Sequence, residues 1–416
     1  MKTDKQGYNG PADFSAIWFA HLAQTAYGWL MAQIPELVTD TATLKQALKV
    51  VSTSDFLAID TEFMRETTYY PQLCLIQVCA NGTAFCIDPL STDIDLTPFF
   101  ELLRDASKTK VFHAGRQDLE IFVHLAGSVP SPVYDTQIAA MVCGLGDQAG
   151  YDRLVHHFTK KTLDKSSRFT NWAQRPLSKR QISYALDDVI YLADIYPKMI
   201  ERLASSGRAN WVNHEMDLLA DKAMYVNDPD TIWQRMKPRG SRPDTINRLV
   251  HLAAWREREA QSRNQPRGRI LRDDTLMDLA GSNPQSLSEF KKIRGFPGGE
   301  GSKFATPVLA TLRQAANTPK SEWPIMERAR REERAPPDVM ELLRVLLKHV
   351  SEDENVAPRL IASADELEKL ALSDTADIRA KTGWRYEIFG AKALKLISGK
   401  LALSVSEKSI KLIELK

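Results

Sequence analysis

The sequence predicts an α/β domain with a mixed β-sheet flanked by helices, followed by two small domains that contain only helices. The chain has 416 residues, more than one hydrophobic core usually serves, so two or three domains are expected. Short apolar stretches typical of strands occur only in the first half of the chain. Beyond about residue 210, amphipathic helical stretches alternate with Pro and Gly breaks.

The composition is that of a folded protein and does not by itself define a partner. Hydrophobic residues make up 43% of the chain and charged residues 26%, which excludes a long disordered chain. A net charge of +2 is too small to require a nucleic-acid partner. The cysteines lack CxxC spacing, which predicts buried, reduced thiols in a cytoplasmic protein and no zinc site. They are Cys74, Cys79, Cys86 and Cys143.

Residues 1–32 are expected to form a dispensable N-terminal extension. The apolar run 17–32 is shorter than a bilayer requires and is interrupted by polar residues such as His21 and Gln24, so no membrane span is expected. A signal peptide is not expected either, because no basic segment precedes a clean apolar block. Met31 is a candidate for the true start, because residues 1–30 show no clear periodicity whereas the sequence from Gln33 onward is typical of the opening of a domain.

The predicted strands all lie within a first domain assigned to residues 33–210. The apolar run 55–60 ends in an acid and reads as a buried strand. Residues 73–79 and 83–88 are predicted to form a hairpin, because Asn81-Gly82 supplies the positive φ angles of a tight turn.

The pattern after this hairpin changes from strand to helix. Residues 110–113 resemble another strand. A helix is expected over 117–125, with Gly127 as its C-terminal stop. Strands followed by helices favour a layered sheet over a barrel.

Two helical domains are predicted over residues 230–316 and 336–403. Pro238, Gly240 and Pro243 mark the start of the first. The segment that begins at Pro266 corresponds loosely to the one that begins at Pro358, which suggests distant repeats of one module.

Asp60 and Glu62 are candidate metal ligands. Their spacing of two on a predicted strand sends both carboxylates to one face of the sheet, where they repel each other. A hard divalent cation such as Mg²⁺ or Mn²⁺ neutralises such a pair. Taken alone, Asp-x-Glu is more often an exposed strand end with two solvated acids.

Further candidates lie at helix positions that can reach the same region. Asp118 follows a strand-to-helix junction, although a first-turn acid is also favoured by the helix dipole. Tyr184 and Asp188 are an i, i+4 pair on one helical face. Asp187 competes with Asp188 for the same role, and the local sequence leaves that choice open.

Together these segments resemble, in order and spacing, the exonuclease motifs of ribonuclease D, in the branch of the DEDD exonucleases with tyrosine in the third motif. The resemblance covers about residues 35–210 and rests on segments 59–63, 70–77, 113–118, 134–137, 175–178 and 184–188. It implies a ribonuclease H-like fold.

The resemblance also implies roles for individual residues. Asp60, Glu62, Asp118 and Asp188 would bind two divalent metal ions, Mg²⁺ or Mn²⁺, and Tyr184 would orient the attacking water. The implied activity is release of 5′-mononucleotides from RNA 3′ ends, with tRNA precursors as substrates. Two metal ions suit phosphodiester hydrolysis, because they stabilise both the attacking and the leaving oxygen.

Other residues in the same segments are given other roles. We interpret Asp135 as structural and His113 as a packed or hydrogen-bonding residue, since hard metals favour oxygen ligands. Phe63, Met64 and Tyr70 either belong to the core or contact the terminal nucleotide.

The first helical region carries a local excess of positive charge. From Asp230 to Ala315 there are sixteen Lys and Arg against nine Asp and Glu, a difference of 16 − 9 = +7, which suits phosphate contacts. Its segments from Leu252 and from Pro266 resemble the HRDC domain, a nucleic-acid-binding module. The final block has balanced charge and is expected to be a divergent HRDC-like domain. The glycine-rich stretch 298–303 lacks a P-loop ending and is interpreted as a turn between helices.

Two rivals to the exoribonuclease remain open at this point. A DNA exonuclease or proofreading subunit uses the same acids, and comparing RNA with DNA hydrolysis separates the two. A binding scaffold with a vestigial site is the second rival, and the complete set of acids argues against it.

Overall fold

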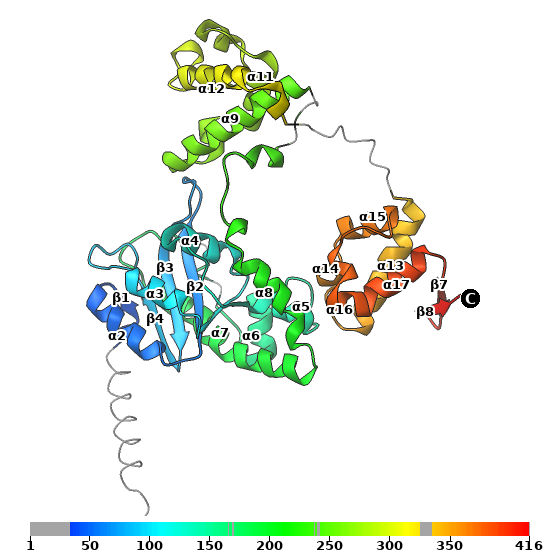
Figure 1. Ribbon diagram of the computed structural model, residues 1–416. Coiled ribbons are helices and arrows are strands. Elements are labelled where there is room, and N and C mark those ends of the chain that lie inside the picture. The colour runs from blue at the N-terminus through cyan, green and yellow to red at the C-terminus, as the bar shows by residue number, and fades with distance from the viewer. Residues whose placement is uncertain are drawn as a thin grey trace, which may run out of the picture.

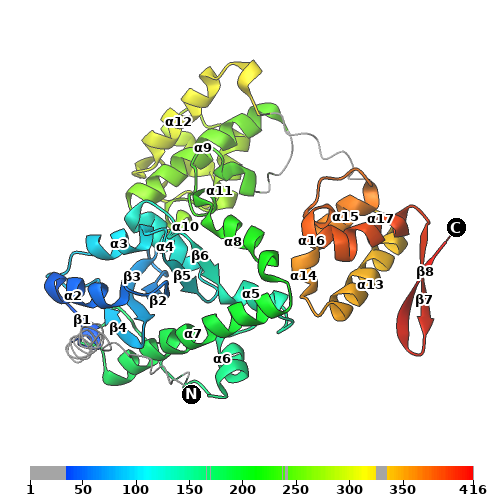
Figure 2. The ribbon, with the colours of Figure 1, turned by 60° about the horizontal axis from the view of Figure 1, so that its bottom comes forward.

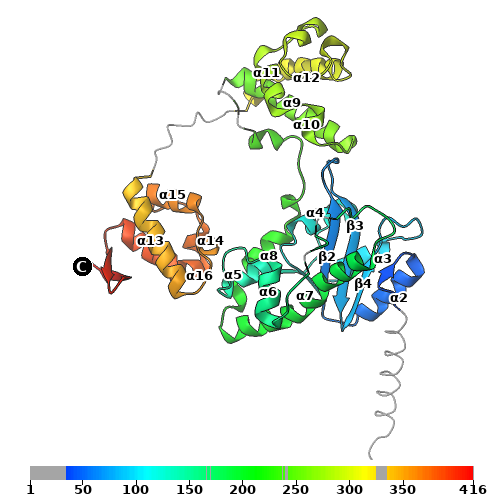
Figure 3. The same cartoon turned by 180° about the vertical axis from the view of Figure 1, so that it is seen from behind.

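The structure, a computed structural model, describes residues 34–164, 166–168, 170–236, 238, 242–324 and 335–415. The predicted extension 1–32 and its candidate start, Met31, lie outside the described residues. Figures 1 to 3 show a first body that contains the β-sheet, a helical body α9–α12 beside the loop between β2 and β3, and a further helical body α13–α17. No helix among the described residues is both long and apolar enough to cross a membrane.

The first body is built on a mixed six-stranded sheet with the strand order β1-β4-β3-β2-β5-β6. Strand β3 pairs antiparallel with both β2 and β4, whereas β1 pairs parallel with β4, and β5 pairs parallel with both β2 and β6. This confirms the mixed α/β fold expected from the sequence. The strands are β1 (Leu37–Val38), β2 (Phe56–Met64), β3 (Gln72–Ala80), β4 (Thr83–Ile87), β5 (Thr109–Phe112) and β6 (Val133–Asp135).

Helices surround this sheet, and the longest of them, α7, packs across β2, β3, β4 and β5 (Figure 3). A capping box formed by Ser178 and Gln181 starts α7 and fixes the position of its first turn. The helices of this body are α2 (Thr41–Val51), α3 (Thr97–Arg104), α4 (Arg116–Ala126), α5 (Thr136–Val142), α6 (Tyr151–Thr159), α7 (Lys179–Ser205) and α8 (Asn213–Ala220).

The β3–β4 hairpin and the β5–α4 junction form as predicted. Asn81 and Gly82 have φ angles of 50° and 72°, as a tight hairpin turn requires. Helix α4 ends at Gly127, which adopts the left-handed conformation as its C-cap. All four cysteines are free and buried.

The second body has a hydrophobic core of its own. Its glycine-rich stretch lies between the 3₁₀ turn η4 and helix α12, as the turn interpretation requires. Short 3₁₀ turns η1 (Ala209–Trp211), η2 (Lys222–Met224) and η3 (Ile232–Arg235) precede this body. Its own elements are α9 (Pro243–Ser262), α10 (Arg267–Ile270), α11 (Asp273–Ser282), η4 (Leu287–Lys292), η5 (Gly299–Gly301), α12 (Ala305–Asn317) and η6 (Lys320–Glu322).

The third body repeats part of this order and adds a β-hairpin. A long helix, a four-residue helix and a further helix follow one another, as α9, α10 and α11 do in the second body. The expectation that strands are absent beyond residue 210 is wrong here, since β7 and β8 pair as an antiparallel hairpin. The elements are α13 (Pro337–Asp353), α14 (Pro358–Ile361), α15 (Ala364–Leu372), η7 (Arg379–Lys381), α16 (Gly383–Arg385), the π-helical turn η8 (Tyr386–Gly390), α17 (Ala391–Ile397), β7 (Leu401–Ser406) and β8 (Ser409–Glu414).

The third body packs directly against the first, and their buried apolar side chains form one continuous cluster. At the contact, the rings of Trp211 and Trp384 stack 4.3 Å apart with an interplanar angle of 3°. The amide of Ala357 donates to the carbonyl of Met141 at 3.0 Å.

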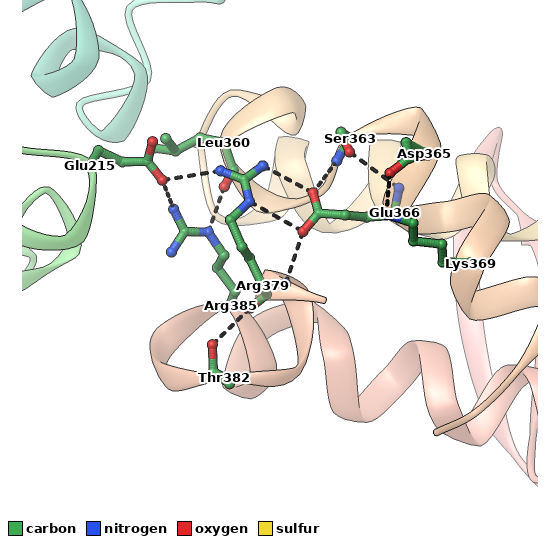
Figure 4. A network of polar contacts seen from close by, with 9 residues as sticks. All are labelled: Glu215, Leu360, Ser363, Asp365, Glu366, Lys369, Arg379, Thr382 and Arg385. Carbon is green, nitrogen blue, oxygen red and sulfur yellow. Dashed lines mark hydrogen bonds and ion pairs between the residues drawn. The ribbon is translucent and has the colours of Figure 1, made fainter. Parts of the chain in front are cut away.

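A network of buried charges reinforces this contact (Figure 4). Glu215 of α8 accepts hydrogen bonds from Arg385 and, at 3.3 Å, from Arg379. Arg379 in turn donates to Glu366 at 2.9 Å. The side chain of Arg385 is only 4% exposed, so the pairing compensates for the cost of removing its charge from water.

Candidate active site

Strand β2 carries the first two candidate acids on one face. Asp60 pairs across the sheet with Gln77 and Glu62 with Leu75, so the two carboxylates project from the same side of the strand. An irregularity in the β2–β3 register follows between Glu62 and Phe63. The two acids therefore lie at the end of the regularly paired part of β2, directly before the register shifts.

The environment of these two acids strongly disfavours their charged forms. Burial raises the pKa of Asp60 well above its usual range, and the charges of Asp118, Asp188 and Glu62 raise it further. Burial also raises the pKa of Glu62 to about 9, with Asp188 and Asp118 as the next causes. The structure therefore brings all four predicted acids into electrostatic contact.

Asp118 enters this group from the first turn of α4. Its side chain is 6% exposed, and burial is the main reason that its pKa rises to about 7. The Thr61 hydroxyl, located between Asp60 and Glu62 on β2, donates a hydrogen bond to the Asp118 carboxylate. That bond ties the start of α4 to the strand that carries the other acids.

Helix α7 contributes Asp188 and Tyr184, which lie one turn apart. Burial, followed by the neighbouring charge of Asp187, raises the pKa of Asp188 to about 7, while a hydrogen bond from Tyr184 opposes the rise. Burial raises the pKa of Tyr184 above its usual range, with Asp188, Glu62 and Asp60 adding to the effect. Tyr184 is thus a neutral hydroxyl donor beside the acids.

Asp187 lies next to this group but interacts differently. Burial and then the charge of Asp164 raise its pKa. Asp188, in contrast, acts electrostatically on both Asp60 and Glu62. Asp187 therefore belongs to the rim of the site rather than to its four-carboxylate centre.

A cavity of about 330 Å³ opens beside Asp60, Tyr184 and Asp188. Of the described residues that line it, Arg168 is the only Lys or Arg. Tyr151 forms part of the wall, and its hydroxyl donates to the backbone carbonyls of Asp187 and Asp188, which anchors α6 to α7. Sequence reasoning missed Tyr151 and Arg168, because neither lies in a periodic stretch and only tertiary contact brings them to the cavity.

Asp135 and His113 support the site rather than join the acids. The Asp135 carboxylate accepts from the amides of Ala114 and Gly115 at 3.1 and 2.9 Å, and it also caps α5. His113 lines the cavity, and its Nδ1 lies 3.0 Å from the Thr136 hydroxyl. Both residues hold the β5–α4 junction in place, in agreement with the structural interpretation of the sequence.

The three residues considered as nucleotide contacts all have protein partners. Phe63 and Met64 pack, partly buried, against two separate apolar clusters. Tyr70 stacks on His124 of α4 with ring centres 3.6 Å apart. Each therefore has a packing role in this structure.

The chemistry of the acid group suits hard divalent cations. Burial raises the pKa of all four oxygen-donor side chains, and their repulsion falls when a cation binds between them. Gln77, opposite Asp60, is fully buried, and its amide has no hydrogen-bond partner within the described parts of the chain. As the side chains are placed, no three His, Cys, Asp or Glu residues of the described ranges converge closely enough to form a finished metal cage. The four carboxylates thus have the oxygen ligands and the negative charge that such ions require. The side chains must move closer together for an ion to bind.

The fold and the grouped acids define this protein as an exonuclease, and comparison with known families agrees. A family model described as "3′-5′ exonuclease" matches residues 35–204. A second, the HRDC domain, matches residues 246–312, within the body formed by α9–α12.

Full-length relatives identify the family. A protein from Zymomonas mobilis named ribonuclease D is 44% identical over 382 residues, which is 91% of this chain and 98% of the relative. A ribonuclease D from Sphingobium indicum is likewise 44% identical and covers 91% of this chain and 99% of its own length. The chain belongs to the ribonuclease D family.

Solved structures agree with this assignment. The structure of Escherichia coli RNase D, described as an exoribonuclease involved in structured RNA processing, superposes with a TM-score of 0.73 at 31% identity. The alignment covers 87% of this chain and 98% of that one. This protein is therefore a 3′–5′ exoribonuclease, and its family membership implies dependence on a divalent metal.

Proposed function

We propose that this protein trims RNA 3′ ends, including those of tRNA precursors, with two divalent ions held by Asp60, Glu62, Asp118 and Asp188. The products are 5′-mononucleotides, and Mg²⁺ or Mn²⁺ serves as the metal. The observation that carries the proposal is the convergence of these four acids from β2, α4 and α7, where Asp118 and Asp188 both lie close enough to raise the pKa of Asp60 and of Glu62.

The bound ions supply activation of the attacking water and stabilisation of the leaving 3′ oxygen. The protein supplies the alignment of both. Asp60 and Glu62 are fixed by the sheet, Asp118 by the Thr61 hydroxyl, and Asp188 by the helix that Tyr151 anchors. Such prior fixation lowers the entropic cost of reaching the transition state.

Tyr184 is assigned to the attacking water. Its pKa lies above the usual range, so its hydroxyl stays protonated at neutral pH and can donate a hydrogen bond. Its neighbour Trp172 lies 6.1 Å away between ring centres and is 2% exposed, which restricts the direction of the tyrosine ring.

We assign a separate role to each helical body and place the protein in the cytoplasm. The HRDC body carries the positive excess counted in the sequence and is proposed to bind the RNA backbone. The body formed by α13–α17 is proposed to be a second, divergent HRDC-like domain, supported by the order it shares with α9–α11. Its role is to brace the nuclease domain through the network in Figure 4.

The test is time-resolved digestion of a 5′-labelled RNA with a single-stranded 3′ tail, using wild type, Asp188→Asn and Asp187→Asn. Loss of a metal-binding acid removes several kcal/mol of transition-state stabilisation, so Asp188→Asn is expected to slow trimming at least roughly a hundredfold. Asp187→Asn is the matched control, with the same chemical change one residue away, and is expected to retain most activity.

Chelation completes the test. EDTA should abolish the 3′ shortening ladder, and added Mg²⁺ or Mn²⁺ should restore it. A folded wild-type protein that binds this RNA but releases no mononucleotides with either metal would contradict the proposal. Faster hydrolysis of a matched DNA would assign the site to DNA instead.

A further inference from the structure

The loop between β2 and β3 contacts the HRDC domain. Tyr69 and Tyr70 each donate a backbone N–H to the side-chain oxygen of Asn264, at 3.1 and 2.9 Å. Asn264 follows the end of α9 and has a φ of 47°, a left-handed conformation that asparagine adopts more readily than most residues. The side chain of Tyr69 also packs against the apolar core of the HRDC domain.

The Tyr69 hydroxyl lies at the centre of a charged cluster. It donates to Glu257, and both Gln261 Nε2 and Arg267 Nη2 lie 3.3 Å from it. Arg267 pairs with Glu257 through two bonds of 2.5 and 2.7 Å and lies over the Tyr69 ring at 5.3 Å. We call Tyr69, Glu257, Gln261, Asn264 and Arg267 the Tyr69 cluster.

This cluster specifies one docked geometry. The Glu257 side chain is 0% exposed, so its charge requires partners that replace water. Arg267 and the Tyr69 hydroxyl supply them, one from each domain. If the HRDC domain separated from the loop, the carboxylate would keep the arginine but lose the tyrosine hydroxyl as a donor. The cost of burying its charge would then be compensated only in part.

The other side of the same loop is fixed to the active site. Arg65, directly after β2, forms a bidentate pair with Glu120 at 2.7 and 2.8 Å. Glu120 lies on α4, two residues after Asp118. Tyr70 stacks on His124 of the same helix. The loop is therefore bound at once to the helix that carries a catalytic acid and to the HRDC domain.

We propose that Tyr69 and Asn264 are positioning residues that hold the HRDC domain over the catalytic end of the sheet, so that RNA bound there presents its 3′ end to the cavity. This inference rests on the proposed function. Its specific content is that the two residues govern long RNA and leave the hydrolysis of short RNA unchanged. A short oligonucleotide fills only the cavity, whereas a long one also spans the HRDC surface.

The experiment compares kcat/KM on a long single-stranded RNA and on a short oligoribonucleotide for wild type, Tyr69→Phe and Asn264→Ala. A misplacement of about 1 Å costs up to roughly a hundredfold in rate, so the long-to-short ratio is expected to fall in each single variant and by about tenfold or more in a variant that carries both changes. Ser262→Ala is the matched control, because its exposed hydroxyl bonds only to the Glu259 carbonyl of its own helix.

RNA binding and the two hydrolysis rates together distinguish a failure of this inference from a failure of the proposed function. RNA binding measured in EDTA should stay within twofold of wild type, since neither variant removes a charge. An unchanged long-to-short ratio in folded variants overturns the inference. An equal loss on both RNAs also overturns it, because that marks a general structural role. A wild type that digests neither RNA would instead contradict the proposed function.

Discussion

At the residue scale, the active site is held in a conformation that is unfavourable in the absence of cations. Asp60, Glu62, Asp118 and Asp188 are drawn together although Asp118 and Asp188 raise the pKa of both acids on β2. The rest of the fold compensates for this repulsion, as is common where function requires an arrangement that stability disfavours. The repulsion should therefore appear in the stability of the metal-free protein.

We predict that Asp60→Asn stabilises the metal-free protein while abolishing activity. An amide does not ionise, so the variant avoids the cost of burying or protonating a carboxyl beside three acidic neighbours and is expected to gain about 1–2 kcal/mol. That gain raises the melting temperature by a few degrees. Calorimetry in EDTA measures it, and a lower melting temperature for the variant would show that the acids do not repel one another in the folded state.

Tyr184→Phe tests the assignment of the attacking water. The change removes one hydroxyl and keeps the ring that packs near Trp172. Loss of a single well-placed donor is expected to lower kcat roughly a hundredfold with little change in KM. Steady-state kinetics on a short RNA give the two constants separately, and a change confined to KM would assign Tyr184 to substrate binding.

The central residues of the candidate site can be predicted from the sequence, whereas the residues that line the cavity around them cannot. Asp60 and Glu62 are readable from strand periodicity, and the i, i+4 spacing brings Tyr184 and Asp188 to one helical face. The choice of Asp188 over Asp187 depends on which carboxylate faces β2, and helical spacing alone does not decide it. Tyr151 reaches α7 only through the packing of α6, which leaves no local signal in the sequence.

At the element scale, the two helical bodies dock onto the nuclease domain through equivalent positions. Asn264 comes two residues after α9, and Asn355 comes two residues after α13. Both adopt positive φ, at 47° and 50°. Asn264 binds the β2–β3 loop, while Asn355 covers Gly144, where an added Cβ would lie 2.3 Å from its side-chain amide. The weak repeat in the sequence thus corresponds to a shared docking corner.

We predict that Gly144→Ala loosens the contact of the third body with the nuclease domain. The added methyl group would collide with Asn355, and Gly144 also has a φ of 71°, which disfavours any side chain. A destabilisation of about 1–3 kcal/mol is expected. Gly127→Ala is the control, since it has a similar φ of 74° but open space around it, and equal losses would exclude a role for the collision.

The contact of the third body should also weaken in acid. Burial acts to raise the pKa of Glu366, but hydrogen bonds from Arg379 and Ser363 outweigh it and lower the pKa to about 2. A depressed pKa contributes stability that is present above the ordinary value near 4.5 and is lost as pH falls toward 2. Near-UV circular dichroism of the Trp211–Trp384 stack should follow this loss.

The variant Glu366→Gln provides the control for this acid titration. It lacks the titrating group, so its stack signal should be weaker at neutral pH and should change less between pH values near 4.5 and 2. If variant and wild type lose the signal in parallel, another group controls the contact.

Secondary structure was predictable where local signals agreed with the final fold. Asn81-Gly82 predicts the β3–β4 hairpin because these residue types readily adopt positive φ angles. The β7–β8 hairpin turns through Glu407 and Lys408, which have φ angles of 49° and 66° without the usual turn residues. Its strands, LALSVS and SIKLIE, do not alternate strictly between apolar and polar residues, and with no turn signal between them the sequence did not reveal the hairpin.

At the scale of the whole molecule, the third body is energetically part of the nuclease domain. Their buried residues form one cluster, whereas the HRDC domain has a separate core. The segments that share this cluster are separated in sequence by the entire HRDC domain.

We predict that a chain ending after residue 324 has a less stable nuclease domain. It would expose apolar surface that α13 to α17 cover, and each 1 kcal/mol lost lowers the melting temperature by about 2–4 °C in a domain of this size. Calorimetry of the truncated and full chains measures the difference. Trp384→Ala in the full chain should reproduce part of it, and an unchanged nuclease transition on truncation would contradict the shared core.

The shared core also bears on synthesis. The residues of α13–α17 leave the ribosome only after the nuclease residues and the whole HRDC domain have emerged. Until then, the apolar face of the nuclease domain beside Trp211 and Met141 has no cover. A nascent chain therefore carries its four acids before it acquires full stability, and a prematurely terminated product retains an exposed apolar face that marks it for proteolysis.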